Sequence, residues 1–296
     1  MDNKQIQPGI LADLPRAARY LFFTLAADVD INVAVQCLRS VAVDRSIVIG
    51  LGPALVMATG ARIEGLRNFP NAAGPEIEIP SQPFSLWCWL RGDDRGALVQ
   101  QTRALQRTLA TAFFLDHVID AFQYGTGRDL TGYEDGTENP KGDNAVSAGI
   151  VNGLGASLDG SSFVAVQQWV HDLEHFDSLS AQEQDHAIGR RKSDNAELTD
   201  APPSAHVKRT AQESFTPAAF VLRRSMPWAD ATRAGLVFVA FGQRFDAFEA
   251  LLNRMLGAED GITDALFRFT RPVSGSYYWC PPVEHGHLNL SAVTAR

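Results

Sequence analysis

The stretch Gly125–Asp143, GTGRDLTGYEDGTENPKGD, lies near the middle of the chain and combines glycines, carboxylates and a proline. Its glycines permit positive φ angles and a close approach of the backbone to a ligand. Asp135-Gly136 and Asn139-Pro140 are turn dipeptides, so the stretch is neither a helix nor a central strand. The carboxylates do not follow the order of an EF-hand loop, which argues against calcium. We predict a loop that contacts a ligand.

Composition limits the partners of the chain. With 296 residues, 45% of them hydrophobic, it can bury a large core as one large or two medium domains. The net charge of −8, with no basic cluster longer than Arg190-Arg191-Lys192, argues against nucleic acid and against an anionic membrane surface. The longest uncharged runs are too short and too rich in glycine to span a bilayer. We therefore expect small molecules or other proteins as partners.

The N-terminal sequence and the cysteines bear on location. MDNKQIQPGILADLPRAARYLFF lacks the pattern of a secretory signal, so we expect a cytoplasmic protein. Cys37, Cys88 and Cys280 are odd in number, far apart and set in apolar sequence. This pattern is typical of buried reduced thiols in a reducing compartment.

The hydrophobic periodicity predicts the same order of elements twice. The first set has strands at 18–28 and 84–91, two short strand pieces within 46–59, and helices at 31–43 and 96–114. The second set has strands at 162–170, 206–210, 219–224 and 236–241, and helices at 181–188 and 245–256. Each set reads as a βαββαβ half. The periodicity therefore predicts a duplicated α+β fold.

Several segments together resemble the dye-decolorizing peroxidases, a family that binds haem b. The residues Gly132–Pro140, GYEDGTENP, resemble the family's GxxDG signature. The resemblance extends over nearly the whole chain, from QPGILADLPRAARYLFF through IGRRKSDNAEL and SAHVKR to VLRRSMPW and GSYYW. It implies a haem-dependent peroxidase of the compact bacterial type, which reduces hydrogen peroxide and oxidises dyes, phenolic donors or porphyrin-like donors.

The same resemblance implies a particular fold. Two ferredoxin-like halves, residues 1–140 and 141–296, would form a dimeric α+β barrel with antiparallel sheets and helices packed outside. One haem b would lie in a cavity between sheet and helices. The GYEDGTENP loop would end the first half, and the second half would supply the haem ligand.

The resemblance also implies roles for residues on the two sides of the haem. His206, in SAHVKRT, matches the proximal iron ligand, and Asp264 is the candidate acceptor that orients its ring. Asp135 matches the acid–base catalyst, and Arg223 matches the distal arginine that stabilises negative charge. Ser225 matches a position near the haem and shares the strand face of Arg223, whereas Arg224 would point to the opposite, solvated face.

The remaining candidates have weaker support in the sequence. Asn139 and Arg190 are candidates for contacts with the haem propionates. Cys280-Pro281 is similar to the pair found where a thiolate ligates haem, although a packed cysteine explains it as well. His171 and His175 are spaced for one face of a helix, and we expect them to be solvated. Glu134 is a second acid beside Asp135 with no role implied by the family.

Two other functions remain open on sequence alone. A non-enzymatic haem carrier or sensor would share His206, but it has no use for an acid and a guanidinium facing the open side of the iron. An enzyme that processes the porphyrin itself is the other alternative. For a peroxidase we expect hydrogen peroxide and a small reducing substrate as ligands, no nucleic acid or membrane, and a homo-oligomer.

Overall fold

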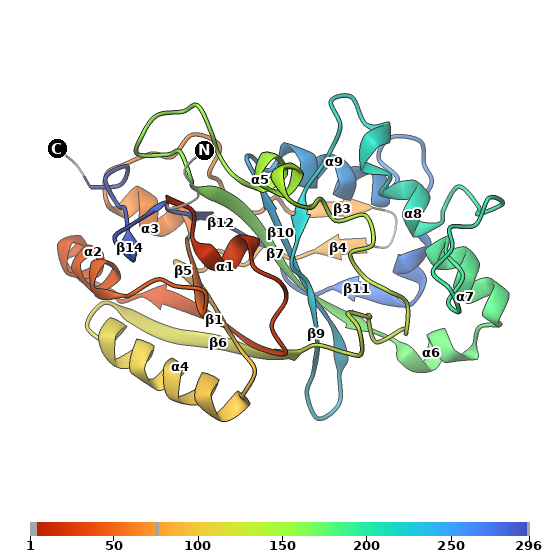
Figure 1. Cartoon of the computed structure of the whole chain (residues 1–296), viewed down its shortest axis with the longest axis horizontal. Coiled ribbons are helices and arrows are strands. Elements are labelled where there is room, and N and C mark those ends of the chain that lie inside the picture. Colours follow the sequence, from red (N-terminus) through yellow and green to blue (C-terminus); the bar gives the residue numbers. More distant parts are fainter. Residues whose placement is uncertain (1–4, 75–76, 295–296) are drawn as a thin grey trace.

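In the computed structural model, which describes residues 5–74 and 77–294, the strands of both halves join into one closed barrel (Figure 1). The barrel strands follow the order β7-β12-β2-β5-β1-β6-β9-β10, and β10 pairs back with β7. All these pairings are antiparallel. Short strands β8 and β11 continue the edges of β10 and β7. The predicted antiparallel α+β architecture is confirmed.

The first half has the strand order β2-β5-β1-β6, which is that of a ferredoxin-like unit. Its strands and helices are β1 (Ala17–Leu25), α2 (Ile31–Ser40), β2 (Ile47–Leu51), β5 (Leu86–Gly92), α4 (Arg95–Leu109) and β6 (Phe113–Phe122). The helices begin where the sequence provides caps. The side chain of Asp30 accepts a hydrogen bond from Asn32 N, and that of Asp94 accepts one from Ala97 N.

The second half repeats this order as β12-β7-β10-β9. Its main elements are β7 (Ser162–His171), α6 (Leu173–Ser178), α7 (Ala181–Ile188), α8 (His206–Arg209), β8 (Leu222–Arg223), β9 (Met226–Ala229), β10 (Ala234–Gly242), α9 (Asp246–Met255), η3 (Ala265–Arg268), β11 (Thr270–Pro272) and β12 (Ser276–Cys280). Ser180 and Glu183 form a capping box that starts α7, and Gly189 ends it with a left-handed φ of 90°.

Short elements precede, connect and follow these units. They are α1 (Pro8–Leu11), α3 (Pro53–Ala58), β3 (Ala72–Gly74), β4 (Ile77–Ile79), α5 (Asp143–Gly149), η2 (Gln212–Ser214), β13 (Val283–Glu284) and β14 (His287–Leu288). In the described part of the chain, no helix is long and apolar enough to cross a membrane.

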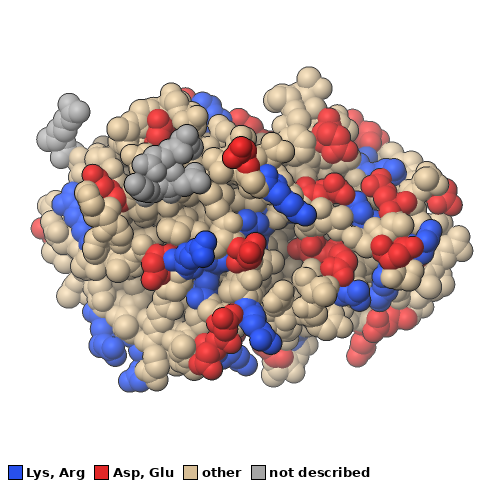
Figure 2. Space-filling view, in the orientation of Figure 1, with Lys and Arg blue, Asp and Glu red and all other residues tan. Residues whose placement is uncertain are grey.

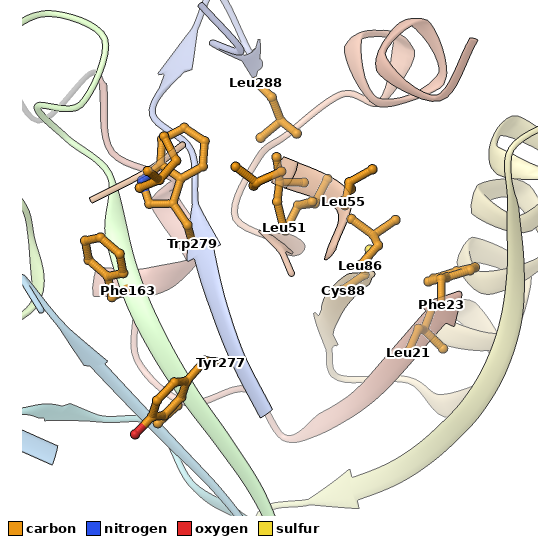
Figure 3. Close-up of a cluster of buried hydrophobic side chains, with 14 of the residues drawn as sticks. Leu21, Phe23, Leu51, Leu55, Leu86, Cys88, Phe163, Tyr277, Trp279 and Leu288 are labelled. Carbon is orange, nitrogen blue, oxygen red and sulfur yellow. The ribbon is translucent and has the colours of Figure 1, made fainter. Parts of the chain in front are cut away.

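The core has two layers because the barrel strands bury both of their faces. Inside the barrel, Trp87 stacks on Tyr20 and on Tyr278, with ring centroids 6.3 and 5.8 Å apart. The outer layer packs the other strand face against the helices, and Figure 3 shows part of it, including Phe23, Leu86 and Trp279. Near-continuous apolar strands such as ARYLFF fit this two-sided burial.

Three predictions about the elements are wrong, and the strand β6 was not predicted. Residues 53–58 form α3 rather than a strand piece, because Pro53 follows Gly52 and is preorganised for the first turn of a helix. Residues 206–209 form the helix α8. The helix predicted at 96–114 ends at Leu109, and β6 follows it. β6 escaped prediction because Asp116, His117 and Asp120 interrupt its apolar pattern.

The loop that follows β6 packs on the second half. It forms an irregular hairpin in which Arg128 pairs with both Tyr124 and Glu134 in isolated bridges. The pairings β6–β9 and β12–β2 join both halves into one barrel. The division of the chain at residue 140 stays a prediction.

Candidate active site

A cavity of about 290 Å³ lies between the outer sheet face of the second half and its helices. The side that we call the sheet wall carries Gln167, Trp169 and His171 of β7, Arg223 of β8, and Leu236 and Phe238 of β10. The side that we call the helix wall carries His206 and Val207 of α8 and Phe248, Leu251, Leu252 and Met255 of α9. The loop after β6 lines it with residues 129, 131 and 133–138. The cavity approaches the size range of small-molecule sites, about 300–1,000 Å³.

His206 is the first residue of α8 and projects from the helix wall. Its Nδ1 lies 2.8 Å from Oδ2 of Asp264, whose side chain is fully buried. The other oxygen of Asp264 accepts a hydrogen bond from Leu266 N, which fixes the carboxylate at the start of η3. Among the described residues, Nε2 of His206 has no hydrogen-bond partner. This nitrogen therefore remains available to a ligand.

Asp135 and Arg223 meet on the other side of the cavity. Oδ1 of Asp135 lies 3.6 Å from Nη1 of Arg223, and both side chains are about one-quarter exposed or less. The amide of Asn139 bonds to both backbone atoms of Arg223, at 2.9 Å to its N and 2.7 Å to its O. Asn139 thus ties the loop to β8 and holds Arg223 opposite Asp135.

This contact differs from the one predicted for Asn139. Its amide is occupied by Arg223, and Asn139 is absent from the residues that line the cavity. The guanidinium of Arg190 does line the cavity, and it pairs with Glu138 at 2.7 Å and with Glu197 at 3.4 Å. Propionate contacts of Asn139 and Arg190 stay predictions, and Arg190 would make them in competition with two carboxylates.

Ser225 and Arg224 lie outside the main cavity. Ser225 is buried, and its Oγ accepts a hydrogen bond from Val239 N at 3.3 Å. It lines a second cavity, of about 10 Å³, which Asp135 also lines. That volume is on the order of one water molecule. The catalytic role of Ser225 stays a prediction.

The prediction that Arg224 is solvated is wrong. Arg224 donates to the carbonyls of Ile10 and Leu11 at the end of α1, and also to the carbonyl of Arg223. The unsatisfied carbonyls of a helix end attract such a cation. Its side chain therefore supports the strand segment that carries Arg223.

The negative charge of Glu134, the additional acid of the loop, is paired with a cation. Its Oε1 lies 2.9 Å from Nε of Arg128 and accepts a hydrogen bond from Thr126 at 3.0 Å. The ion pair offsets its negative charge beside Asp135.

Cys280 cannot serve as the alternative ligand. It is fully buried inside the barrel, and it does not line the cavity. Burial raises the pKa of its thiol well above the usual range, so the thiolate is disfavoured.

The expectation that His171 is solvated on a helix is also wrong, because His171 ends β7 and its side chain is only 6% exposed. Nε2 of His171 lies 3.0 Å from Oδ1 of Asp129, and Nδ1 lies 2.6 Å from Oγ1 of Thr270. The other oxygen of Asp129 accepts two hydrogen bonds from Thr131. These contacts pin the tip of the loop to β7 and β11. His175, on α6, is exposed as expected.

Burial alone would raise the pKa of Asp129, but the hydrogen bond and charge of His171, with the hydrogen bonds of Thr131, lower it. Because the folded-state pKa is depressed, this stabilisation is present above the ordinary aspartate pKa, about 3.9, and is lost as the pH falls through the lowered value.

We expect Asp129→Asn to lower the free energy of unfolding by about 1–3 kcal/mol at neutral pH, because it removes a charged acceptor from three donors. Urea denaturation from about pH 3 to 7 should show this difference shrinking in acid. Asp200→Asn, at an exposed position, is the control and should change little. A difference that stays constant down to the lowest pH would contradict the assignment.

The cavity face therefore defines a site with an available imidazole on one wall and an acid–guanidinium pair across from it. Residues 126–285, more than half of the chain, match the family model described as Dyp-type peroxidase, C-terminal. The chain belongs to the Dyp-type peroxidase family and is a peroxidase.

Individual relatives agree with this family. The chain is 28% identical to the dye-decolorizing peroxidase of Mycobacterium tuberculosis, over 93% of this chain and 88% of that protein. Among solved structures, a dyp-type peroxidase protein from Shewanella oneidensis has a TM-score of 0.87 and 25% identity, with 98% of each chain covered. The dye-decolorizing protein from V. cholerae has a TM-score of 0.81 and 26% identity, over 92% of this chain and 96% of that one.

Proposed function

We propose that this peroxidase holds one haem b in the cavity, with the iron ligated by Nε2 of His206. A Rhodococcus jostii DypB variant in complex with heme supports the cofactor, since it is 25% identical over 94% of this chain with a TM-score of 0.83. The single observation that carries the proposal is the placement of His206 with Asp264 on one wall and of Asp135 with Arg223 on the other.

The residues present fit a haem group. The lining includes apolar side chains from α9 and β10, which suit a macrocycle, and the imidazole nitrogen that would bind iron is unpartnered among the described residues. Arg190, in the same lining, could meet a propionate.

Asp264 would determine which nitrogen of His206 binds the iron. Its carboxylate accepts a hydrogen bond from the N–H at Nδ1, so that Nε2 is left as the ligand and the imidazole becomes more electron-rich. When bound, haem supplies an open coordination position for hydrogen peroxide and the capacity to take up its two oxidising equivalents.

Asp135 and Arg223 would act on the peroxide itself. The carboxylate of Asp135 accepts the proton of the near oxygen and returns it to the far oxygen, which leaves as water. The guanidinium of Arg223 would stabilise the negative charge that develops as the O–O bond breaks. Asn139 and Arg224 hold the backbone of Arg223 during this reaction.

The acid–guanidinium pair also argues against a haem carrier or sensor, which has no proton to move on this side of the cavity.

The reducing substrates, the cellular location and the oligomeric state are proposals as well. We propose dyes and phenolic or porphyrin-like compounds as reducing substrates, a cytoplasmic location and a homo-oligomer. Figure 2 shows both acidic and basic side chains around a recess in the surface, so charge at this face does not select between cationic and anionic donors.

Steady-state oxidation of a dye by the haem-loaded protein tests the proposed function. We expect turnover that depends on hydrogen peroxide and is absent from the protein before haem is added. A haem-loaded protein that binds haem stably but oxidises no donor would favour the carrier instead.

A further inference from the structure

Tyr133 stands between the cavity and a carboxylate. Its ring lines the cavity and is 4% exposed, and its hydroxyl donates a hydrogen bond to Oδ1 of Asp185 on α7 at 2.5 Å. Burial, together with the hydrogen bond and charge of Asp185, raises the pKa of Tyr133 well above its usual range. The phenol is therefore protonated and has a proton acceptor within bonding distance.

Each of the other tyrosines lacks a place in the lining of the main cavity, a carboxylate partner, or both. The hydroxyls of Tyr20 and Tyr278 are buried inside the barrel without a hydrogen-bond partner among the described residues. Tyr277 donates to Glu249 at 3.0 Å, but it does not line the cavity. Tyr124 is 45% exposed and borders only the smaller cavity. Tyr133 is the one tyrosine that both lines the main cavity and has a carboxylate partner.

The pair of Tyr133 and Asp185 extends from the cavity to the surface of the protein. Asp185 also accepts a hydrogen bond from the backbone N of Lys192 at 3.0 Å, and Lys192 is exposed. The ammonium of Lys192 lies 5.4 Å from the ring centre of Tyr133. The close approach depends on Gly132, because a Cβ there would lie 2.6 Å from Cε of Lys192. One aromatic ring thus separates the cavity from a charged surface site.

We infer that Tyr133 is a one-electron donor to the haem group after peroxide has oxidised it, with Asp185 as the proton acceptor. This inference rests on the proposed function. One electron leaves Tyr133 and reduces the oxidised haem by one equivalent. The phenolic O–H bond breaks, and the proton forms a bond to Asp185. The products are a neutral tyrosyl radical and a protonated carboxyl.

The two transfers are coupled because Tyr133 is shielded from water. The residue is 4% exposed and its hydroxyl is bonded to Asp185, so the carboxylate is the acceptor in place to take the proton when the electron leaves. A reducing substrate at the Lys192 surface then returns the electron, and Asp185 returns the proton. A donor too large for a cavity of about 290 Å³ is oxidised by this route without entering.

Electron paramagnetic resonance of the haem-loaded protein, frozen after one equivalent of hydrogen peroxide, tests the inference. We expect a tyrosyl signal in the wild type and its loss to background in Tyr133→Phe, which removes only the hydroxyl. Asp185→Asn should reduce the yield several-fold, because the amide is a far weaker proton acceptor. Tyr277→Phe removes the other carboxylate-bonded tyrosine and should leave the signal unchanged. Labelling with a nitroso spin trap and peptide mass mapping should place the adduct on Tyr133.

Two results would overturn the inference while leaving the peroxidase assignment intact. One is a wild type that reacts with peroxide, as seen in its absorption spectrum, without forming a tyrosyl signal. The other is a signal that persists in Tyr133→Phe and disappears in Tyr277→Phe. A wild type that takes up no haem, or whose spectrum does not respond to peroxide, would instead defeat the proposed function and this inference together.

Discussion

His206→Ala should abolish ligation of haem iron by the protein. Nε2 of His206 is the unpartnered imidazole nitrogen of the cavity lining, and Asp264 holds the ring by its other nitrogen. His171, the other histidine in the lining, has both ring nitrogens bonded, to Asp129 and Thr270. His171 can therefore replace the ligand only by breaking these contacts.

The absorption spectrum after haem addition measures this loss. The wild type should show the Soret band of histidine-ligated ferric haem, and His206→Ala should show that of loosely held haem, removable by apomyoglobin. His175→Ala is the matched control, because this histidine is exposed on α6. An unchanged Soret band in His206→Ala would refute the assignment of the ligand.

Asp135→Asn and Arg223→Leu should slow the reaction with peroxide in distinguishable ways. Loss of the general base should cost about 10²–10⁴-fold. Loss of the charge-stabilising group should cost about 10²–10³-fold. Arg223 stabilises charge and transfers no proton, so its removal should slow the reaction at every pH. The defect of Asp135→Asn should shrink at alkaline pH, where peroxide itself loses a proton.

Stopped-flow single-turnover rates of the haem-loaded variants, from about pH 5 to 9, separate the two roles. Glu134→Gln is the matched control, since this neighbouring carboxylate pairs with Arg128 rather than with Arg223. Wild-type rates in both variants at every pH would exclude catalysis by either residue and would favour a carrier.

The sequence predicted the duplicated fold because apolar strands and amphipathic helices are local patterns. The helix at 181–188, with its capping box and terminal glycine, was predicted with its observed bounds. Prediction failed where tertiary contacts outweigh local pattern. His206–Arg209 lacks the length for helical periodicity, and β6 carries charged residues on its exposed face.

The residues of the site were also predicted only in part. His206 and Asp264 are 58 positions apart, and Asp135 and Arg223 are 88 apart, yet family resemblance selected all four and the structure brings each pair together. The pairs Asp129–His171 and Tyr133–Asp185 were missed, because neither partner belongs to a motif that points to the other. The clue available was the position of Asp129 and Tyr133 within the signature loop itself.

The absorption spectrum of the purified protein, titrated with haem and then treated with one equivalent of hydrogen peroxide, tests the central claim most directly. The account predicts saturation at one haem per chain, a Soret band that changes within the first moments after peroxide is added, and its return when a reducing dye follows. A protein that takes up no haem, or a Soret band that peroxide leaves unchanged, would contradict it.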